Sequence, residues 1–326
     1  MSHTSLNVKV SFSLLSGLPA SGKSAISKFI LEAIKLSNVD LIILPVPFDD
    51  LLPLPISFDL QTSNSNIESL PKVNTDVVVW KRIREHIRFA IIFLMKICVN
   101  SYNNHLELGE IPMSDFIQSF LQSDLNKAES DFPMGNIDLD LICKILLSII
   151  KSFSNIFTEF KISEGFTCVS SIEFVKAFIK WHHLLLESSS FKFGTLILLD
   201  DNFFYGSMRH EYYKIARTCT YSYSYTYFRY HRYMSIQYYL LILDGLGFSI
   251  IYLDAPVELC IFRNRERAAS SPRVAVSEDT IRRMHQVFEA PIGSSARPFE
   301  RHVLRIDAEH LSQESLLQYF FISEYL

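Results

Sequence analysis

The chain has 326 residues, of which 48% are hydrophobic and 20% charged, the balance of a soluble protein that buries a core. Its net charge of −4 excludes a general basic coat, so contact with nucleic acid needs a local patch, and DNA is not an expected partner. Five scattered cysteines without a CxxC pair argue against a disulfide framework or a zinc site.

The N-terminal part of the chain alternates strands and helices. Residues 8–15 are apolar and β-branched enough to form a buried parallel strand, and a glycine-rich break follows them. Residues 23–36 carry apolar side chains at helical spacing, and residues 39–45 predict a second buried strand. Residues 77–99 predict a long helix with a basic stripe, which is either a nucleic-acid contact or a solvated helix face. The stripe consists of Lys81, Arg82, Arg84 and Arg88.

The middle of the chain predicts helices alone. Residues 114–128, 139–160 and 170–186 are helical candidates, and no strong strand signal interrupts them. The most apolar stretches, 87–99 and 137–150, carry charges and are too short to cross a bilayer, and no signal peptide is apparent. We therefore expect a helical insertion within a cytoplasmic protein that has no membrane partner.

The C-terminal part returns to alternating strands and helices. Residues 195–199 and 248–253 predict buried strands, and a helix is expected at 207–217. Residues 257–268 start as a helix and end in an arginine cluster. In residues 220–244, tyrosines alternate with other residues; such a surface could stack nucleic-acid bases, but we favour a low-complexity insertion. The alternation as a whole predicts a mostly parallel sheet covered on both faces.

The break after the first strand carries a phosphate-binding motif. Eight residues match G-x-x-x-x-G-K-[ST], namely Gly17, Leu18, Pro19, Ala20, Ser21, Gly22, Lys23 and Ser24. Glycines allow a tight turn that presents N–H groups to phosphate oxygens, and the following helix adds its positive N-terminal end. We expect Lys23 to neutralise the β- and γ-phosphates of ATP and the Ser24 hydroxyl to bind Mg²⁺. This P-loop alone does not separate a kinase from a GTPase or a motor ATPase.

Acidic pairs follow two of the predicted strands. Asp49 and Asp50 come after the second strand, and Asp200 and Asp201 end a later one. Ligands of open α/β sheets bind beyond the carboxyl ends of the strands. A carboxylate of the first pair could therefore orient or deprotonate an acceptor hydroxyl, and one of the second could hold Mg²⁺ directly or through water. Capping of the following helices is the alternative interpretation.

An arginine cluster adds a third feature. Arg263, Arg265 and Arg267 could form a segment that closes over the phosphates and stabilises charge on the transferring group, although arginine runs also occur as solvated faces. No base-reading motif of the Asn-Lys-x-Asp type is present. The P-loop, the acidic pairs and the arginines together favour a kinase.

These features predict an α/β fold of the P-loop NTPase type, with a mostly parallel sheet flanked by helices and a helical insertion. We expect the kinase domain to comprise residues 1–100 and 191–310, with the tyrosine-rich insertion at 220–244. Residues 101–190 form the predicted helical insertion, and residues 311–326 a C-terminal helix or tail. The sequence does not indicate an oligomeric state.

Several stretches resemble the family of O-phosphoseryl-tRNA(Sec) kinases, also called L-seryl-tRNA(Sec) kinases. The P-loop looks like the family's GLPxxGKS loop. The stretch that starts at Asp200-Asp201-Asn202 and ends at Ser207-Met208-Arg209 is similar to its LDDNxYYxSMR signature, with Phe204 in place of the first tyrosine. The similar stretches further along are Ile251-Tyr252-Leu253-Asp254-Ala255-Pro256, Arg263-Asn264-Arg265-Glu266-Arg267 and Phe288-Glu289-Ala290-Pro291.

The resemblance implies ATP-dependent phosphorylation of the seryl hydroxyl on Ser-tRNA(Sec), a step of selenocysteine synthesis. On the nucleotide side, it implies that Lys23 and Ser24 serve ATP and Mg²⁺, that Asp201 contributes to the metal site, and that Arg263 and Arg267 are lid arginines. The implied partner is an aminoacylated tRNA.

On the acceptor side, the resemblance implies that Asp50, which is followed by Leu51-Leu52-Pro53, activates the serine hydroxyl. Asp49, Asp200 and Arg209 are expected to line the substrate. Nine arginines and five acidic residues lie between positions 263 and 305, so a local positive patch could meet tRNA phosphates within an acidic chain.

The sequence departs from the family pattern in three places. Residues 220–244 stand where the family has a short turn, Phe299 stands where a tryptophan is expected, and the stretch beyond Glu309 is short. Three alternatives stay open: an Elongator-associated tRNA-binding regulatory ATPase, a small-molecule or nucleoside kinase, and a degenerate nucleotide-binding scaffold. The 200–209 stretch speaks against the first, and the intact Lys23 and Ser24 speak against the last.

Overall fold

The computed structural model describes the parts of the chain that carry the predicted sheet and its loops. The described residues are 9–36, 41–51, 83–95, 98, 141–142, 144–146, 148–149, 194–220, 247–270, 275–293 and 297–310. The predicted helices at 114–128 and 170–186, residues 221–244 of the tyrosine-rich insertion, the tail at 311–326, and Lys81 and Arg82 of the basic stripe lie outside these residues. Within the described part of the chain, no helix is both long and apolar enough to span a membrane.

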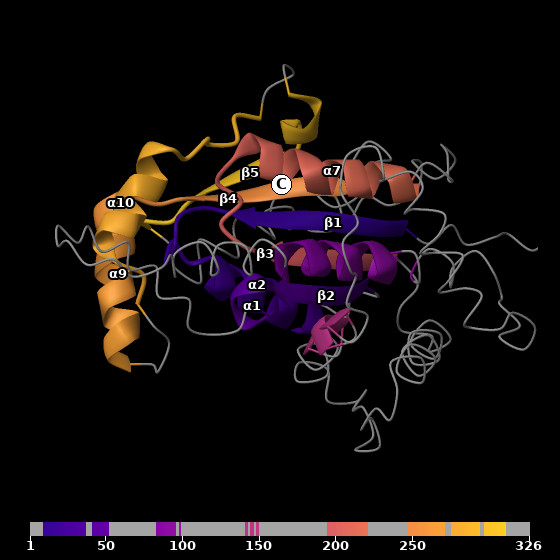
Figure 1. The fold of residues 1–326 in the computed structure, drawn as a ribbon, viewed down its shortest axis with the longest axis horizontal. Helices are drawn as coiled ribbons and strands as arrows, with labels where there is room; N and C mark the ends of the chain where they lie inside the picture. Colours follow the sequence, from indigo (N-terminus) through magenta and orange to yellow (C-terminus); the bar gives the residue numbers. More distant parts are fainter. Residues whose placement is uncertain are drawn as a thin grey trace, which may run out of the picture.

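One parallel sheet organises the described residues, and its five strands follow the order β2-β3-β1-β4-β5 (Figure 1). The strands are β1 (Lys9–Ser16), β2 (Leu41–Pro47), β3 (Gly194–Asp200), β4 (Phe248–Asp254) and β5 (Val303–Asp307). The helical segments are α1 (Lys23–Leu36), α2 (Phe48–Leu51), α7 (Gly206–Thr220), α9 (Val257–Ser270), α10 (Glu278–Gln286) and the 3₁₀ turn η2 (Pro298–Glu300). Residues 83–95 are also helical, as are described residues between 141 and 149.

The predicted strands and helices agree with the sheet, apart from their ends. The strand β2 continues two residues beyond its predicted end and includes Pro45 and Pro47. Because β2 forms one edge of the described sheet, it pairs with β3 alone and tolerates residues that lack an N–H. The helices α7 and α9 run to Thr220 and Ser270, past their predicted ends, and α9 therefore includes the arginine cluster.

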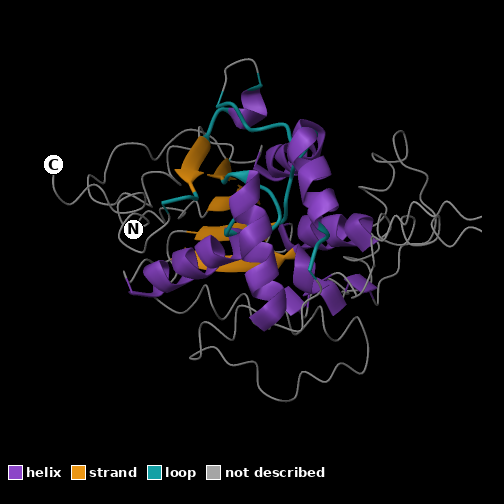
Figure 2. Ribbon diagram, turned by 90° about the vertical axis from the view of Figure 1, so that its left-hand side faces the viewer, coloured by secondary structure: helices purple, strands orange, loops and turns teal. Residues whose placement is uncertain are grey.

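The core lies on both faces of the sheet, which is why most residues of the strands are apolar. The helix α1 covers one face with Ile26 and Ile30 against strand residues such as Leu198. The other face packs against α7 and the helix at 83–95. Figure 2 shows the strands gathered in one layer with helices beside it. The architecture is α/β and consistent with a P-loop NTPase-type fold, as the sequence predicts.

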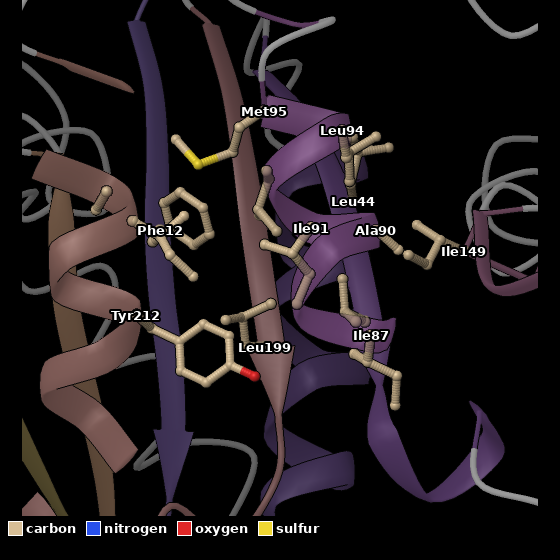
Figure 3. Packing of buried hydrophobic residues seen from close by; sticks show 14 of the residues in the cluster. Phe12, Leu44, Ile87, Ala90, Ile91, Leu94, Met95, Ile149, Leu199 and Tyr212 are labelled. Atoms are coloured by element: carbon tan, nitrogen blue, oxygen red, sulfur yellow. The ribbon is translucent and has the colours of Figure 1, made fainter. Parts of the chain in front are cut away.

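The helix at 83–95 is held to the sheet by a stripe of apolar side chains. Ile87, Ile91 and Met95 have exposed fractions of 0% and belong to the same cluster as Phe12 of β1 and Tyr212 of α7 (Figure 3). Burial of one such side chain contributes about 1.5–3 kcal/mol, so these contacts fix the helix firmly. Its polar residues are thereby placed against the edge of the sheet where the strands end.

Candidate active site

The loop between β1 and α1 forms a tight cradle. Gly22 has a φ of +109°, which L side chains rarely adopt. A Cβ atom at Gly17 would lie 2.7 Å from the Ser21 hydroxyl oxygen and 2.8 Å from the carbonyl oxygen of Leu253, so only glycine fits there. The helix α1 begins directly after the loop, at Lys23, and points its first N–H groups at the cradle.

Two observations test whether this cradle suits a phosphate. The lack of a Cβ at Gly17 lets the backbone of the loop lie close to Ser21 and to the end of β4. The Ser21 hydroxyl oxygen is fully buried and has no hydrogen-bond partner within the described residues. Ser24, in the first turn of α1, is exposed and can offer its hydroxyl. The residues present therefore fit a nucleoside triphosphate with its Mg²⁺ ion.

Lys23 lies inside the loop, with an exposed fraction of 8%. Its Nζ donates to the carbonyl oxygens of Gly17 at 3.1 Å and Leu18 at 2.7 Å, and to Asn202 Oδ1 at 2.9 Å. Burial lowers the pKa of Lys23, while the charges of Asp200 and Asp49 raise it. Lys23 is thus a buried cation near carboxylates from the ends of two different strands.

The register of the sheet explains how these carboxylates meet. Asp200, the last residue of β3, pairs with Pro47 at the end of β2 and with Leu15 near the end of β1. Asp49 follows on the short helix α2 and is exposed, while Asp200 is buried. The backbone of Asp50 lies in the same helical turn, next to Asp49. The structure therefore gathers the expected acidic strand ends beside the loop, although the side chain of Asp50 lies outside what is described.

The arginine cluster lies on α9, at the carboxyl ends of the strands (Figure 1). Arg263 donates to the carbonyl oxygens of Ser21 in the loop at 3.2 Å and of Ala308 after β5 at 2.8 Å. Arg267 donates to Asn264 at 3.0 Å, and its charge lowers the pKa of Lys23. Arg265 instead points outward and pairs with Glu278. Arg263 thus contacts the loop, the charge of Arg267 acts on Lys23 within it, and Arg265 points away.

Arg209 occupies a different position from the one its predicted role requires. Its guanidinium has an exposed fraction of 0%, and it forms an ion pair with Glu300, which is equally buried. Arg209 Nη1 also donates to the carbonyl oxygen of Phe203 at 2.7 Å. These contacts place Arg209 inside the protein, where it holds the segment after β3 and presents no surface to an acceptor.

The segment after β3 is fixed by several contacts. Phe203 has a φ of +43°, which is rare for a bulky residue and is tolerated only where the surroundings enforce it. Its ring is buried in edge-to-face contacts with Phe48 and Tyr212, and its carbonyl accepts from Arg209 and from the Ser16 hydroxyl. Held in this way, the preceding residue, Asn202, reaches Lys23.

Two glutamates, Glu289 and Glu300, complete this arrangement. Glu289 Oε2 accepts from the Gly206 N–H at 2.9 Å, which places a carboxylate at the N-terminus of α7, and the Glu289 N–H donates to Phe204. Glu300 pairs with Arg209. The stretches at 200–209 and 288–291, both of which resemble the kinase family, therefore contact each other. The sequence alone predicts no role for Asn202, Glu289 or Glu300. For Asn202 and Glu289, the available signal was a polar residue inside a stretch that resembles the family.

The basic stripe on the helix at 83–95 is not a solvated face at its described members. Arg84 has an exposed fraction of 14% and pairs with Asp201 at the end of β3. Arg88 has an exposed fraction of 15% and lies 3.9 Å from Glu211 of α7. Because the helix packs flat on the sheet, Arg84 reaches the end of β3, whereas Arg88 lies beside α7. That correction adds Arg84 to the site, where sequence reasoning had not placed it.

Four arginines of the region at 263–305 pair with acidic residues of the protein. Arg282 pairs with Glu258, and Arg305 pairs with Asp254. Arg265 and Arg297 also have acidic partners. Exposed pairs of this kind contribute little to stability, so phosphates of a nucleic acid could exchange for the acidic partners.

These features place a tight glycine-rich loop on a parallel sheet, with acidic strand ends and arginines beside it, in a fold consistent with the P-loop NTPase type. The chain is similar to the mouse (Mus musculus) L-seryl-tRNA(Sec) kinase, with 32% identity over 122 residues, or 37% of this chain. It is also similar to the human (Homo sapiens) L-seryl-tRNA(Sec) kinase, with 28% identity over 163 residues, or 49% of this chain. The matched regions span 25% and 38% of the lengths of these two relatives. No family model matches the chain.

Proposed function

We propose that this chain is a P-loop kinase that transfers the γ-phosphoryl group of ATP to the seryl hydroxyl of Ser-tRNA(Sec), within the cytoplasm. The observation that carries the kinase assignment is the position of Lys23, which is buried in a glycine cradle beside carboxylates from the ends of β2 and β3. The two similar proteins named L-seryl-tRNA(Sec) kinase support the choice of acceptor.

The nucleotide side of the site rests on the loop and on α9. Lys23 and the first-turn amides of α1 hold the β- and γ-phosphates, and the exposed Ser24 hydroxyl offers a ligand for Mg²⁺. When bound, Mg²⁺ neutralises charge on the phosphates. Arg263 and Arg267 stabilise the charge that spreads over the transferring group.

The acceptor side rests on the turn after β2. The Asp50 carboxylate accepts the proton of the seryl hydroxyl as its oxygen attacks the γ-phosphorus atom. The bond from that phosphorus to the β–γ bridging oxygen breaks, and ADP leaves with the electron pair. Asp49, exposed on the same turn, orients the acceptor, while Asp200 lies between this turn and Lys23.

Arg209 acts in this proposal as a positioning residue. Because it is buried against Glu300 and Phe203, it fixes the segment that presents Asn202 to Lys23. It does not touch the acceptor.

The decisive experiment incubates the purified chain with γ-labelled ATP and Ser-tRNA(Sec), beside Ser-tRNA(Ser) and free nucleosides. We expect label on Ser-tRNA(Sec) alone, recovered as phosphoserine after deacylation. Lys23→Ala and Asp50→Ala should abolish the label while the far-ultraviolet circular dichroism of the protein is unchanged.

Other outcomes of the same experiment identify the competing activities. Hydrolysis of ATP that tRNA stimulates, without label on the tRNA, indicates a regulatory ATPase. Label on a nucleoside or another small alcohol, without tRNA, indicates a small-molecule kinase. Either result overturns the proposed acceptor.

A further inference from the structure

Arg84 lies where the two acidic strand ends meet. Its guanidinium pairs with Asp201, directly after β3. Its Cζ atom also lies 5.3 Å from the centre of the Phe48 ring, in cation–π contact, and Phe48 starts the turn that carries Asp49 and Asp50. One side chain from the helix at 83–95 therefore contacts both elements that bring carboxylates to the site.

Both residues that Arg84 contacts, Phe48 and Asp201, are buried. The Phe48 ring is fully buried and meets Phe203 and Tyr212 edge to face, with centroids 5.8 Å and 6.3 Å away. Asp201 has an exposed fraction of 7%. The helix that carries Arg84 is fixed by its apolar stripe. The guanidinium thus joins two groups that are themselves buried.

The electrostatic setting of Arg84 agrees with this placement. Burial lowers the pKa of the guanidinium, while Tyr212, Glu211 and Asp49 act in the opposite direction. The influence of Asp49 places the exposed acidic turn within reach of the Arg84 charge. A planar guanidinium can stack on a ring and pair with a carboxylate at the same time, which an ammonium group does poorly.

Stability alone is a weak reason for this arrangement. A buried ion pair can often be replaced by apolar residues without loss of stability, because desolvation offsets the attraction of the charges. The helix is already anchored by its apolar face. What the pair adds is a fixed charge and a fixed orientation at the edge of the site where the acceptor hydroxyl must be deprotonated.

We propose that Arg84 is a positioning residue of the acceptor side, which links Asp201 to the Phe48 turn and so holds the backbone of the turn that carries Asp49 and Asp50. This inference rests on the proposed phosphoryl transfer to an alcohol. It also separates the two carboxylates at the end of β3: Asp201 serves this link, and the charge of Asp200 acts on Lys23.

Arg88 provides a matched control variant. It lies one turn later on the same helix with nearly the same exposed fraction, but its acidic neighbour is Glu211 on α7. Arg84→Gln and Arg88→Gln therefore remove the same group from the same helix, once at the acidic strand ends and once away from them.

Four measurements test the proposal on these variants and on Arg84→Ala. For Arg84→Gln we expect an unchanged dissociation constant for ATP and a kcat for transfer to Ser-tRNA(Sec) about 100-fold lower, the order of loss that a displacement of about 1 Å produces. Added guanidinium ions should restore part of the activity of Arg84→Ala. Hydrogen exchange should accelerate at the amides of α2 in Arg84→Gln. Arg88→Gln should show none of these effects.

The outcomes are separable from those for the proposed function. If wild-type protein labels no alcohol, the proposed function fails, and the exchange at α2 still decides whether Arg84 holds the turn. If wild-type protein is active and Arg84→Gln keeps the kcat of Arg88→Gln, the positioning role is overturned. Should Arg84→Gln fold poorly, Arg84→Gln/Asp201→Asn removes both charges; recovery of folding without recovery of kcat supports the proposal, and recovery of both overturns it.

Discussion

The ion pair between Arg209 and Glu300 gives the sharpest test of the structure. Both side chains have an exposed fraction of 0%, and the two residues lie 91 positions apart in the chain. The perturbation is Arg209→Met, which keeps an unbranched apolar stem but leaves the buried Glu300 carboxylate with the half-exposed Arg297, 3.7 Å away, as its remaining cationic neighbour. The same substitution at Arg282, whose pair with Glu258 is exposed, is the matched control.

The structure sets the size of the expected effect. Removal of one partner from a buried ion pair costs about 3–5 kcal/mol, because an uncompensated charge stays in the interior. Arg209→Met also removes the donor to the Phe203 carbonyl. Since whole proteins are stable by only about 5–15 kcal/mol, this loss is a large share of the total. Arg209→Met/Glu300→Leu removes both charges, and most of the lost free energy of unfolding should return.

Urea denaturation followed by circular dichroism measures these free energies. We expect a much lower midpoint for Arg209→Met, recovery in the double variant, and a midpoint near wild type for Arg282→Met. If Arg209→Met lost no more stability than Arg282→Met, the pair would behave as a surface contact, and the buried network described here would be wrong.

Three further predictions concern the loop. Gly17→Ala should abolish ATP binding, measured by calorimetry, because its Cβ atom would lie 2.8 Å from the Leu253 carbonyl oxygen. Burial lowers the pKa of Lys23, whereas bound phosphates favour its charged form. Once the pH exceeds that lowered pKa, the ATP complex therefore holds more protons than the free protein. The affinity for ATP should then fall as the pH rises further. Calorimetry in buffers of different ionisation enthalpy should show proton uptake, which Lys23→Met removes. Asn202→Ala should lower ATP affinity about tenfold or less, since it deletes one hydrogen bond to Lys23, and unchanged binding would show that Asn202 does not prepare the lysine.

The sequence predicted the elements that depend on local signals. The helix α1 starts at Lys23 and ends at Leu36 as predicted, because a glycine break and helical spacing of apolar residues mark it. The strands β3 and β4 match to within one residue at each end, since each is a short apolar run that ends at an acidic residue. The ends of β2, α7 and α9 depended on which neighbours each element has, and that information is not local.

The parts of the site that sequence reasoning missed depend on contacts between distant residues. Nothing near Arg84 in the chain indicates that its helix lies flat against the end of β3, so its stripe could be taken for a solvated face. Arg209 belongs to a stretch that resembles the family, but its partner Glu300 lies in another element. Sequence patterns indicate which residues belong to the site more readily than they indicate which way those side chains face.

Two side-chain cations donate hydrogen bonds to the main chain of the loop itself. Lys23 donates to Gly17 and Leu18, and Arg263 donates to Ser21. A triphosphate that enters must therefore exchange with carbonyl oxygens, and the strength of its binding is a difference between two sets of contacts. Small dianions gain less from that exchange than a magnesium-bound triphosphate, so the loop should reject free inorganic phosphate even though two positive groups lie at it.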